Sequence, residues 1–186
     1  MARIVLGVSG ASGTELALRT AEALAEHVEV HTVVTDGAKA VMDSETDTRA
    51  ETMERLDSLS TAVYDEDDFG AAIASGTFET EGMVVVPCSM NTLAKVAAGF
   101  SDSLLTRAAD VTLKEDRPLV FVPRESPLSE VHLENMQTVA SRGVTIVPPM
   151  LGFYYEPEGI DDVVDHVVGK ILDRFDLSYD EFERWS

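Results

Sequence analysis

The chain of 186 residues contains one cysteine, one tryptophan and only four lysines. Cys88 has no partner for a disulfide within the chain, which fits a reducing compartment such as the cytoplasm. No apolar stretch approaches the roughly 20 residues that a membrane-spanning helix needs, and the first residues lack the pattern of a signal peptide. We therefore expect a cytoplasmic protein that does not bind membranes.

Basic residues are scarce as well. The 14 lysines and arginines face 34 aspartates and glutamates, and the net charge of −20 argues against binding to nucleic acid or to an anionic membrane. Hydrophobic residues make up an ordinary 45% of the chain, so the acidic residues do not belong to a disordered segment. Such an acid excess on a globular chain indicates adaptation to high salt, in which repulsion between like charges is screened.

The sequence does contain a regular alternation of short apolar runs with amphipathic stretches. We predict strands at 3–8, 28–35, 83–87, 118–123 and 144–148. We predict helices at 13–26, 36–44, 89–100, 102–115, 129–142 and 160–175. The strands are apolar almost throughout, as in a sheet that is covered on both faces. The pattern predicts a single α/β domain over 1–186, with a doubly wound parallel sheet between two helix layers, and a surface excursion with one or two short helices at 45–82.

The first predicted strand runs into a glycine-rich turn, with glycines at positions 7, 10 and 13. Unpaired N–H groups at the start of the next helix attract anions, so the turn predicts a phosphorylated ligand, with Ser9 and Ser12 near its phosphate. The spacing differs from the dinucleotide pattern G-x-G-x-x-G, although Asp36 keeps a nicotinamide dinucleotide open. No Gly-Lys-Ser/Thr follows, which excludes a Walker loop. A plain turn in which Ser12 caps the helix stays open as well.

Polar residues also follow the other predicted strands. They are Thr35-Asp36-Gly37, Cys88-Ser89-Met90-Asn91-Thr92, Arg124-Glu125-Ser126-Pro127 and Pro148-Pro149-Met150. In doubly wound folds the ligand lies beyond the carboxyl ends of the strands, so we expect these segments to converge on it. Each hydroxyl could instead cap a helix, Ser89 in particular.

Cations are concentrated in one part of the chain. Four of the fourteen lie within 18 residues, at Arg107, Lys114, Arg117 and Arg124. Arg107 and Lys114 are about two helical turns apart and share a helix face. In so acidic a chain this cluster indicates an anionic ligand. The alternative is pairing with acids on the same helix, namely Asp102, Asp110 and Glu115.

Two glutamates are candidates for proton chemistry. Glu125 adjoins Arg124 at a strand end, and Glu45 lies just after the second predicted helix. The flanking cation would keep Glu125 ionised in the free protein, while an incoming phosphate and burial would favour its protonated form, which suits proton exchange with a phosphate leaving group. Cys88 is expected to be a small buried side chain. The four histidines have no metal-ligand spacing, so no metal site is expected, and no G-x-S-x-G elbow occurs.

Several longer segments resemble the UbiX-type flavin prenyltransferases, within the wider flavoprotein fold that also includes phosphopantothenoylcysteine decarboxylase. The matching segments are SGASG (9–13), Glu45-Thr46-Asp47, residues 88–136, PPMLGFYYEP (148–157) and GKILD (169–173). They span nearly the whole chain. The combination of RAADVTLKE at 107–115 with PRESPL at 123–128 is highly specific.

The resemblance implies a Rossmann-like flavoprotein fold and an enzyme that transfers a dimethylallyl group from dimethylallyl phosphate to reduced FMN without a metal. New bonds at flavin N5 and C6 would give prenylated FMN, the cofactor of UbiD-type decarboxylases, which would receive the product. The positions that match FMN-binding residues are Gly10, Ala11, Ser12, Thr35, Ser89, Met90, Asn91, Thr92 and Arg124. Tyr154 and Lys170 match the residues that hold dimethylallyl phosphate.

The resemblance also implies catalytic roles for four charged residues. Glu125 would give a proton to the departing phosphate and take one from flavin C6, and Glu45 would lie near N5. Arg107 and Lys114 would lie around the phosphate. The chain departs from the family at Thr35, where serine is common, and at 150–154, which reads Met-Leu-Gly-Phe-Tyr; both departures could alter donor preference.

Family members form dodecamers in which neighbouring subunits complete the pocket, so we expect a homo-dodecamer, with the tail 176–186 docked on a neighbour. Two other functions stay open. An FMN-dependent decarboxylase of the phosphopantothenoylcysteine or peptidyl-cysteine type would need a histidine soon after the second strand, where residues 35–39 contain none. A flavin carrier would bind prenylated FMN without turnover.

Overall fold

The computed structural model of the chain describes residues 1–182. Its strands are β1 Arg3–Val8, β2 Glu29–Val34, β3 Ala62–Asp65, β4 Gly82–Cys88, β5 Leu119–Pro123 and β6 Thr145–Ile146. Its helices are α1 Thr14–Ala25, α2 Asp36–Glu45, α3 Arg49–Leu59, α4 Met90–Ala98, α5 Leu104–Lys114, α6 Glu130–Ala140 and α7 Ile160–Leu172. Two short 3-10 helices are η1 Ala72–Ala74 and η2 Asp173–Phe175.

The strands of the described residues form one sheet in the order β3-β2-β1-β4-β5-β6, and every pair is parallel. β1 lies in the centre, between β2 and β4. The winding direction reverses between β1 and β4, and ligands of open α/β sheets bind at such a reversal, beyond the carboxyl ends of the strands. The predicted doubly wound parallel sheet is confirmed.

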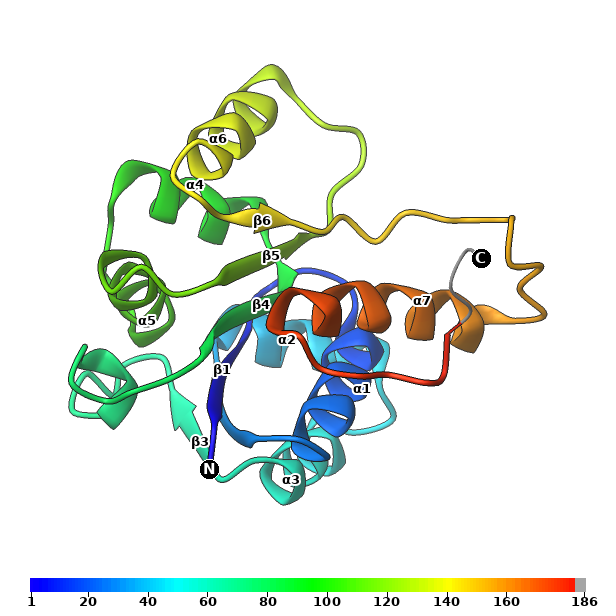
Figure 1. The fold of residues 1–186 in the computed structure, drawn as a ribbon, viewed down its shortest axis with the longest axis horizontal. Helices are drawn as coiled ribbons and strands as arrows, with labels where there is room; N and C mark the ends of the chain where they lie inside the picture. The colour runs from blue at the N-terminus through cyan, green and yellow to red at the C-terminus, as the bar shows by residue number, and fades with distance from the viewer. Residues whose placement is uncertain (183–186) are drawn as a thin grey trace.

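Alternate residues of each strand enter two separate apolar cores. In β1, Ile4 and Leu6 pack on one face of the sheet with α1 and α7, while Val5 packs on the other face with α4 and α5. Figure 1 shows the same division, with α1, α3 and α7 on one side of the sheet and α4, α5 and α6 on the other. Near-continuous apolar strands follow from this arrangement, because neither face meets water.

The expectation for residues 45–82 was incomplete. The segment does contain a short helix, α3, but it also contains β3, an edge strand that pairs with β2 between His31 and Val34. β3 is only four residues long and its last residue, Asp65, begins an acidic run. An edge strand has one neighbour and one half-exposed side, so it needs little apolar character, and the sequence therefore gave a weak strand signal.

A long arm over residues 147–159 leaves the body after β6 and runs beside the first half of α7 (Figure 1). It contains no helix or strand. Three of its large apolar side chains are mostly exposed: Met150 at 68%, Leu151 at 67% and Phe153 at 76%. A single chain therefore leaves this surface uncovered.

The described part of the tail packs on its own chain. Leu177 and Tyr179 contact the core beneath α1 and α7, and the Tyr179 hydroxyl donates a hydrogen bond of 2.6 Å to buried Asp165. His27 Nε2 lies 2.9 Å from the carbonyl oxygen of Ser178. The expected docking of residues 176–186 on a neighbour stays a prediction for the last four residues, which lie outside the described residues. None of the helices within residues 1–182 is long and apolar enough to cross a membrane.

Candidate functional site

Ser9 joins the two strand ends where the winding reverses. Its hydroxyl donates to the carbonyl oxygen of Pro87 at 2.9 Å and accepts from the N–H of Ser89 at 2.8 Å, and the residue is 1% exposed. The hydroxyl thus both donates and accepts a hydrogen bond within the protein. The expectation that Ser9 lies against a phosphate is wrong, since this side chain fixes β1 to β4.

The start of α1 already holds an anion, the carboxylate of Glu45. The N–H groups of Gly13 and Thr14 donate to Glu45 oxygens at 3.0 and 2.9 Å. Burial alone would raise the pKa of Glu45, but hydrogen bonds from Ser12, Thr14 and Gly13 outweigh it and hold the pKa below its ordinary value. Gly13, not Ser12, is the N-cap, so the alternative of a Ser12 cap is wrong. Glu45 remains ionised beside the glycine turn.

The turns after β1 and β2 touch through two glycines. A Cβ added to Gly10 would lie 3.0 Å from the Cα of Gly37, which is tighter than nine in ten real Cβ contacts. Thr35 caps α2 by accepting from the N–H of Ala38 at 3.1 Å. Because the two turns lie so close together, this side of the carboxyl edge presents the glycine backbone and the Thr35 hydroxyl, with no larger side chain between them.

A cavity of about 310 Å³ opens beside these turns. Five of the residues predicted to bind FMN line it: Gly10, Thr35, Ser89, Asn91 and Thr92. Gly37, from the segment Thr35-Asp36-Gly37 that was expected to converge on the ligand, also lines it. The other lining residues were not predicted from the sequence; they are Glu66, Lys95, Ser103, Leu105 and Thr106. The cavity therefore brings together segments from the ends of β1, β2 and β4, as the parallel sheet predicts, and adds the start of α5.

Hydroxyls at two helix starts form one wall of this cavity. Ser89 accepts from the N–H of Thr92 at 3.1 Å and so caps α4. Ser103 and Thr106 form a reciprocal capping box at the start of α5. The capping alternative for Ser89 is confirmed, and the same residue lines the cavity. A Ser-x-x-Thr pattern at 103–106 was the available signal for the part of this wall that α5 supplies.

The remaining predicted FMN residues lie around the cavity. Ala11 and Met90 are buried, and Met90 belongs to the core on the α4 side of the sheet, while Ser12 is exposed at the turn. Arg124 is exposed just beyond β5, and its N–H donates to the carbonyl oxygen of Cys88 at 3.2 Å. The backbone of Arg124 therefore lies next to the end of β4.

Glu125 and Cys88, at the ends of β5 and β4, differ in their exposure to solvent. Glu125 has an exposed side chain, and its Oε1 accepts from the N–H of Ser126 at 3.0 Å. Cys88 is fully buried, and burial raises the pKa of its thiol far above the ordinary value. The expectation that Cys88 packs rather than reacts is thus supported, and Glu125 is left accessible to a ligand.

Arg107 and Lys114 do not reach this cavity within one chain. Arg107 donates to the carbonyl oxygen of Ala74 at 3.1 Å and pairs with Asp110 at 2.7 Å, and Lys114 pairs with Glu115. The pairing with neighbouring acids that the sequence left open is therefore present. α5 runs from the cavity toward the start of β5, which carries Lys114 to the opposite edge of the sheet.

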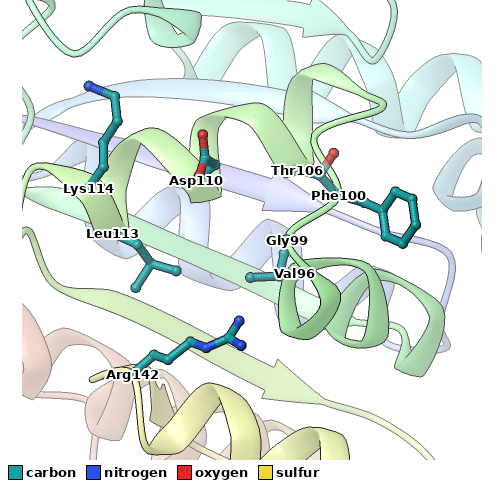
Figure 2. Close-up of a pocket in the computed structure, with 8 residues that line it drawn as sticks. All are labelled: Val96, Gly99, Phe100, Thr106, Asp110, Leu113, Lys114 and Arg142. Atoms are coloured by element: carbon teal, nitrogen blue, oxygen red, sulfur yellow. The ribbon is translucent and has the colours of Figure 1, made fainter.

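Lys114 lies instead at a second cavity of about 350 Å³ between α4, α5 and the end of α6. Figure 2 shows Lys114 and Arg142 on opposite sides of this cavity, with the Lys114 ammonium turned away from Arg142. Arg142 donates to the carbonyl oxygen of Ala97 at 2.7 Å. Phe100 also lines this cavity and is 60% exposed. This surface thus carries two cations and one exposed aromatic ring.

Tyr154 and Lys170 are brought together around α7. The Tyr154 hydroxyl lies 3.2 Å from Nε2 of His166, which precedes Lys170 by about one helical turn. The Lys170 ammonium lies 5.7 Å from the ring centroid of Phe182, and that ring contacts the His166 ring edge-on. The two residues predicted to hold the donor thus share one aromatic cluster, although they are distant from the glycine turn in sequence.

The cavity beside Tyr154 is acidic. It has a volume of about 440 Å³, and its lining carboxylates are Glu156, Glu158, Asp162 and Glu181. Four carboxylates repel a phosphate, so this cavity does not suit an anionic donor. Within residues 1–182, no three histidine, cysteine or acidic side chains are placed to hold a metal ion.

The parallel sheet, its glycine turn and the hydroxyl-lined cavity at the reversal define a nucleotide-binding α/β protein of the doubly wound class. The Flavoprotein family profile matches residues 1–172. The flavin prenyltransferase LpdB of Lactiplantibacillus plantarum is 49% identical over 100% of this chain and 98% of its own length. The chain belongs to the UbiX-like flavin prenyltransferases of the flavoprotein family.

Solved structures agree with this assignment. A dodecameric FMN-dependent UbiX-like decarboxylase from Escherichia coli O157:H7 has a TM-score of 0.94 and 45% identity, covering 99% of both chains. AnUbiX (PadA1), in complex with FMN and dimethylallyl pyrophosphate, has a TM-score of 0.95 and 44% identity, covering 100% of this chain and 97% of its own. The fold thus belongs to a structural family that includes an FMN complex.

Proposed function

We propose that this chain transfers the dimethylallyl group of dimethylallyl phosphate to reduced FMN and so makes prenylated FMN. The observation that carries the proposal is the cavity at the carboxyl edge, because Gly10, Thr35 and the start of α4 meet there. AnUbiX supports it, since that relative binds FMN and a dimethylallyl donor on the same fold. Reduced FMN, when bound, supplies the nucleophilic N5 and C6 atoms at which the new bonds form.

The residues of the cavity fit a flavin nucleotide. They offer hydroxyls, an amide, bare glycine backbone and one ammonium group, which suits a ligand with a phosphate and several hydroxyls. We assign the FMN contacts to Gly10, Ala11, Ser12, Thr35, Ser89, Met90, Asn91, Thr92 and Arg124. Of these, Arg124 comes from the end of β5 and extends the site from the cavity toward Glu125.

Glu125 is proposed to move the protons of the reaction. The bond between the allyl carbon and the phosphate oxygen breaks, and its electron pair leaves with the phosphate. Glu125 would give a proton to that phosphate and later take the proton that C6 loses, so its carboxyl would return to its first state. The proton that N5 loses on alkylation balances the one that the prenyl double bond takes up when the ring closes. Its exposed position at the end of β5 leaves it open to both partners.

Glu45 is proposed to act through its charge. Ser12, Gly13 and Thr14 hold it ionised, so it is a poor proton donor at neutral pH. A fixed carboxylate near N5 stabilises positive charge on the departing allyl group, and it needs no reorganisation to do so. This assigns the two glutamates different tasks.

The donor phosphate is proposed to lie between chains. Tyr154 and Lys170 hold it, and Arg107 and Lys114 stabilise its charge as it leaves. Within one chain the cavity at Tyr154 is acidic, and Lys114 lies at the wrong edge of the sheet for the FMN cavity. A site that uses all four residues therefore needs a second copy of the chain.

We propose a homo-dodecamer for the same reason. The Escherichia coli relative is dodecameric, and the exposed apolar arm at Met150, Leu151 and Phe153 offers a surface that another copy could cover. High salt would screen the repulsion between chains that carry −20 each. A size measurement in high salt that finds only monomer contradicts the dodecamer.

The setting of the reaction follows from composition and chemistry. We propose the cytoplasm of a salt-adapted cell, since the single cysteine is reduced and buried and the chain is strongly acidic. Prenylated FMN is a finished cofactor rather than an intermediate of this site. We propose that a UbiD-type decarboxylase receives it.

The histidines bear on the decarboxylase alternative. His27 contacts Ser178, His31 lies in β2, His132 caps α6 and His166 lies in α7, so none of them lines the FMN cavity. A cysteine decarboxylase that relies on a histidine after the second strand has no such residue here. This favours prenyl transfer over histidine-dependent decarboxylation.

The test is an anaerobic assay with reduced FMN and either dimethylallyl phosphate or dimethylallyl pyrophosphate, followed by mass analysis of the released flavin. We expect a flavin heavier by one prenyl unit, and the preferred donor identifies the leaving group. Glu125→Gln should slow turnover at least roughly tenfold while FMN stays bound. Tight binding of prenylated FMN without any turnover would instead indicate a carrier.

A further inference from the structure

Lys95 is the only cation among the described residues that line the FMN cavity. It lies on α4, about one helical turn after Asn91, and its side chain is 34% exposed. Its ammonium group lies 2.9 Å from Oδ2 of Asp102, an acid whose own side chain is 49% exposed. Neither the sequence patterns nor the family resemblance drew attention to this lysine.

The cavity has one wall that repels anions. Glu66 lines it and accepts from the N–H of Asp36 at 2.9 Å, so the start of α2 already carries a carboxylate. The start of α1 is likewise occupied by Glu45. A phosphate that approached either helix start would meet a negative charge.

The starts of α4 and α5 contribute no acid to the cavity lining, although Asp102, which precedes α5, pairs with Lys95 beside it. The starts of α4 and α5 present neutral hydroxyls, from Ser89, Thr92, Ser103 and Thr106, and Lys95 lies on the same side. Hydroxyls and helix N-termini bind anions, and an ammonium group adds the charge that they lack. The lining of the cavity therefore distinguishes a repulsive side from an attractive one.

We propose that Lys95 is the cation that neutralises the FMN phosphate, on the wall formed by the starts of α4 and α5. The inference rests on the proposed function, because it takes FMN as the ligand of this cavity. The FMN phosphate carries nearly two negative charges at neutral pH, and the chain as a whole carries −20, so a local cation is needed to hold it. When FMN binds, the ammonium group of Lys95 leaves Asp102 and pairs with the phosphate, and the exposed carboxylate of Asp102 is then solvated by water.

The experiment compares FMN with riboflavin, which lacks the phosphate, by titration with flavin fluorescence. Lys95→Met should weaken FMN binding roughly ten- to a hundredfold and leave riboflavin binding unchanged. Asp102→Asn should preserve or strengthen FMN binding, because it frees the ammonium group. Lys39→Met is the matched control, since Lys39 also pairs with aspartates, Asp36 at 3.2 Å and Asp65 at 2.6 Å, but does not line the cavity.

Each outcome of these titrations supports or overturns either the role of Lys95 or the proposed function. Unchanged FMN affinity in Lys95→Met overturns the role of Lys95 and leaves the proposed function intact. Equal losses of FMN and riboflavin also overturn it, because they indicate a structural effect. Failure of the unaltered protein to bind FMN overturns the proposed function itself. The salt dependence of FMN binding by the unaltered protein is a second measure, and it should be steeper than the salt dependence of riboflavin binding.

Discussion

His31 is buried near the amino edge of the sheet, on the opposite side from the FMN cavity. It is 6% exposed, its Nδ1 lies 3.0 Å from the Tyr64 hydroxyl, and its Nε2 has no hydrogen-bond partner among the described residues. Burial lowers the pKa of His31, and Arg3 lowers it further, while Glu29 opposes them weakly. The folded protein thus holds this ring in its neutral form.

A loss of stability on mild acidification follows from that environment. The unfolded chain binds the proton near the ordinary pKa of 6.5, whereas the folded chain binds it only at lower pH. The free energy of unfolding should therefore fall as pH drops from about 7.5 to 5.5. Urea denaturation across this range, in high salt, measures the slope.

His31→Gln should flatten that slope, because it removes the group that takes up the proton. His132→Gln is the control, since His132 lies at the start of α6 and glutamine can keep its capping bond. A slope in His31→Gln as steep as in the unaltered protein would assign the effect to other groups. His166 is the first of these to examine, because burial also lowers its pKa and Lys170 adds to the effect.

Single residues were predictable where they follow a strand. Thr35 and Ser89 come directly after apolar runs, so their place at the carboxyl edge could be derived from the sequence. Lys95 could not, since it lies within a helix and reaches the cavity only because α4 starts there. Glu66 was missed together with β3, the strand that positions it.

At the level of elements, the cavity depends on how closely two turns approach. Gly10 lies within the turn after β1, Gly37 lies in the first turn of α2, and their backbones are in contact. The glycine spacing predicted a turn but not its partner, because the contact joins residues far apart in sequence. The same limit applies to Glu45, whose place at the start of α1 depends on where α2 ends.

Gly10→Ala should separate these turns. The added Cβ would lie 3.0 Å from the backbone of Gly37, which has no side chain to move aside. We expect a loss of about 1–3 kcal/mol in the free energy of unfolding and weaker FMN binding. Thermal or urea denaturation and flavin titration measure the two effects.

Gly159→Ala serves as the comparison. A Cβ at Gly159 meets nothing within 4 Å, and its φ of −155° suits any residue. This variant should stay within about 0.5 kcal/mol of the unaltered protein and bind FMN normally. If both alanine variants bind FMN equally well, the glycine contact does not shape the cavity.

The whole molecule presents an incomplete donor site. Lys114 precedes the start of β5 and Glu125 follows its end, so the two residues of one chain lie at opposite edges of the sheet. The arm leaves the sheet after β6, and its Tyr154 contacts α7 (Figure 1). The parallel sheet and its two helix layers could be predicted from the sequence, since they follow from patterns along one chain. Contacts between copies could not, because exposed residues such as Phe153 are not marked by any periodic pattern.

Mixed oligomers test whether the active site is shared. Lys114→Ala and Glu125→Gln should each slow prenyl transfer strongly when present alone. If the two residues meet across subunits, co-assembly of the variants restores both side chains in about a quarter of the sites, so activity should rise well above that of either parent. Co-expression with two affinity tags isolates the mixed species, and its rate of FMN prenylation is measured in high salt. Activity that stays at the average of the parents would mean that each chain supplies both residues to its own site, and the separation of Lys114 from the FMN cavity would then require a rearrangement within the chain.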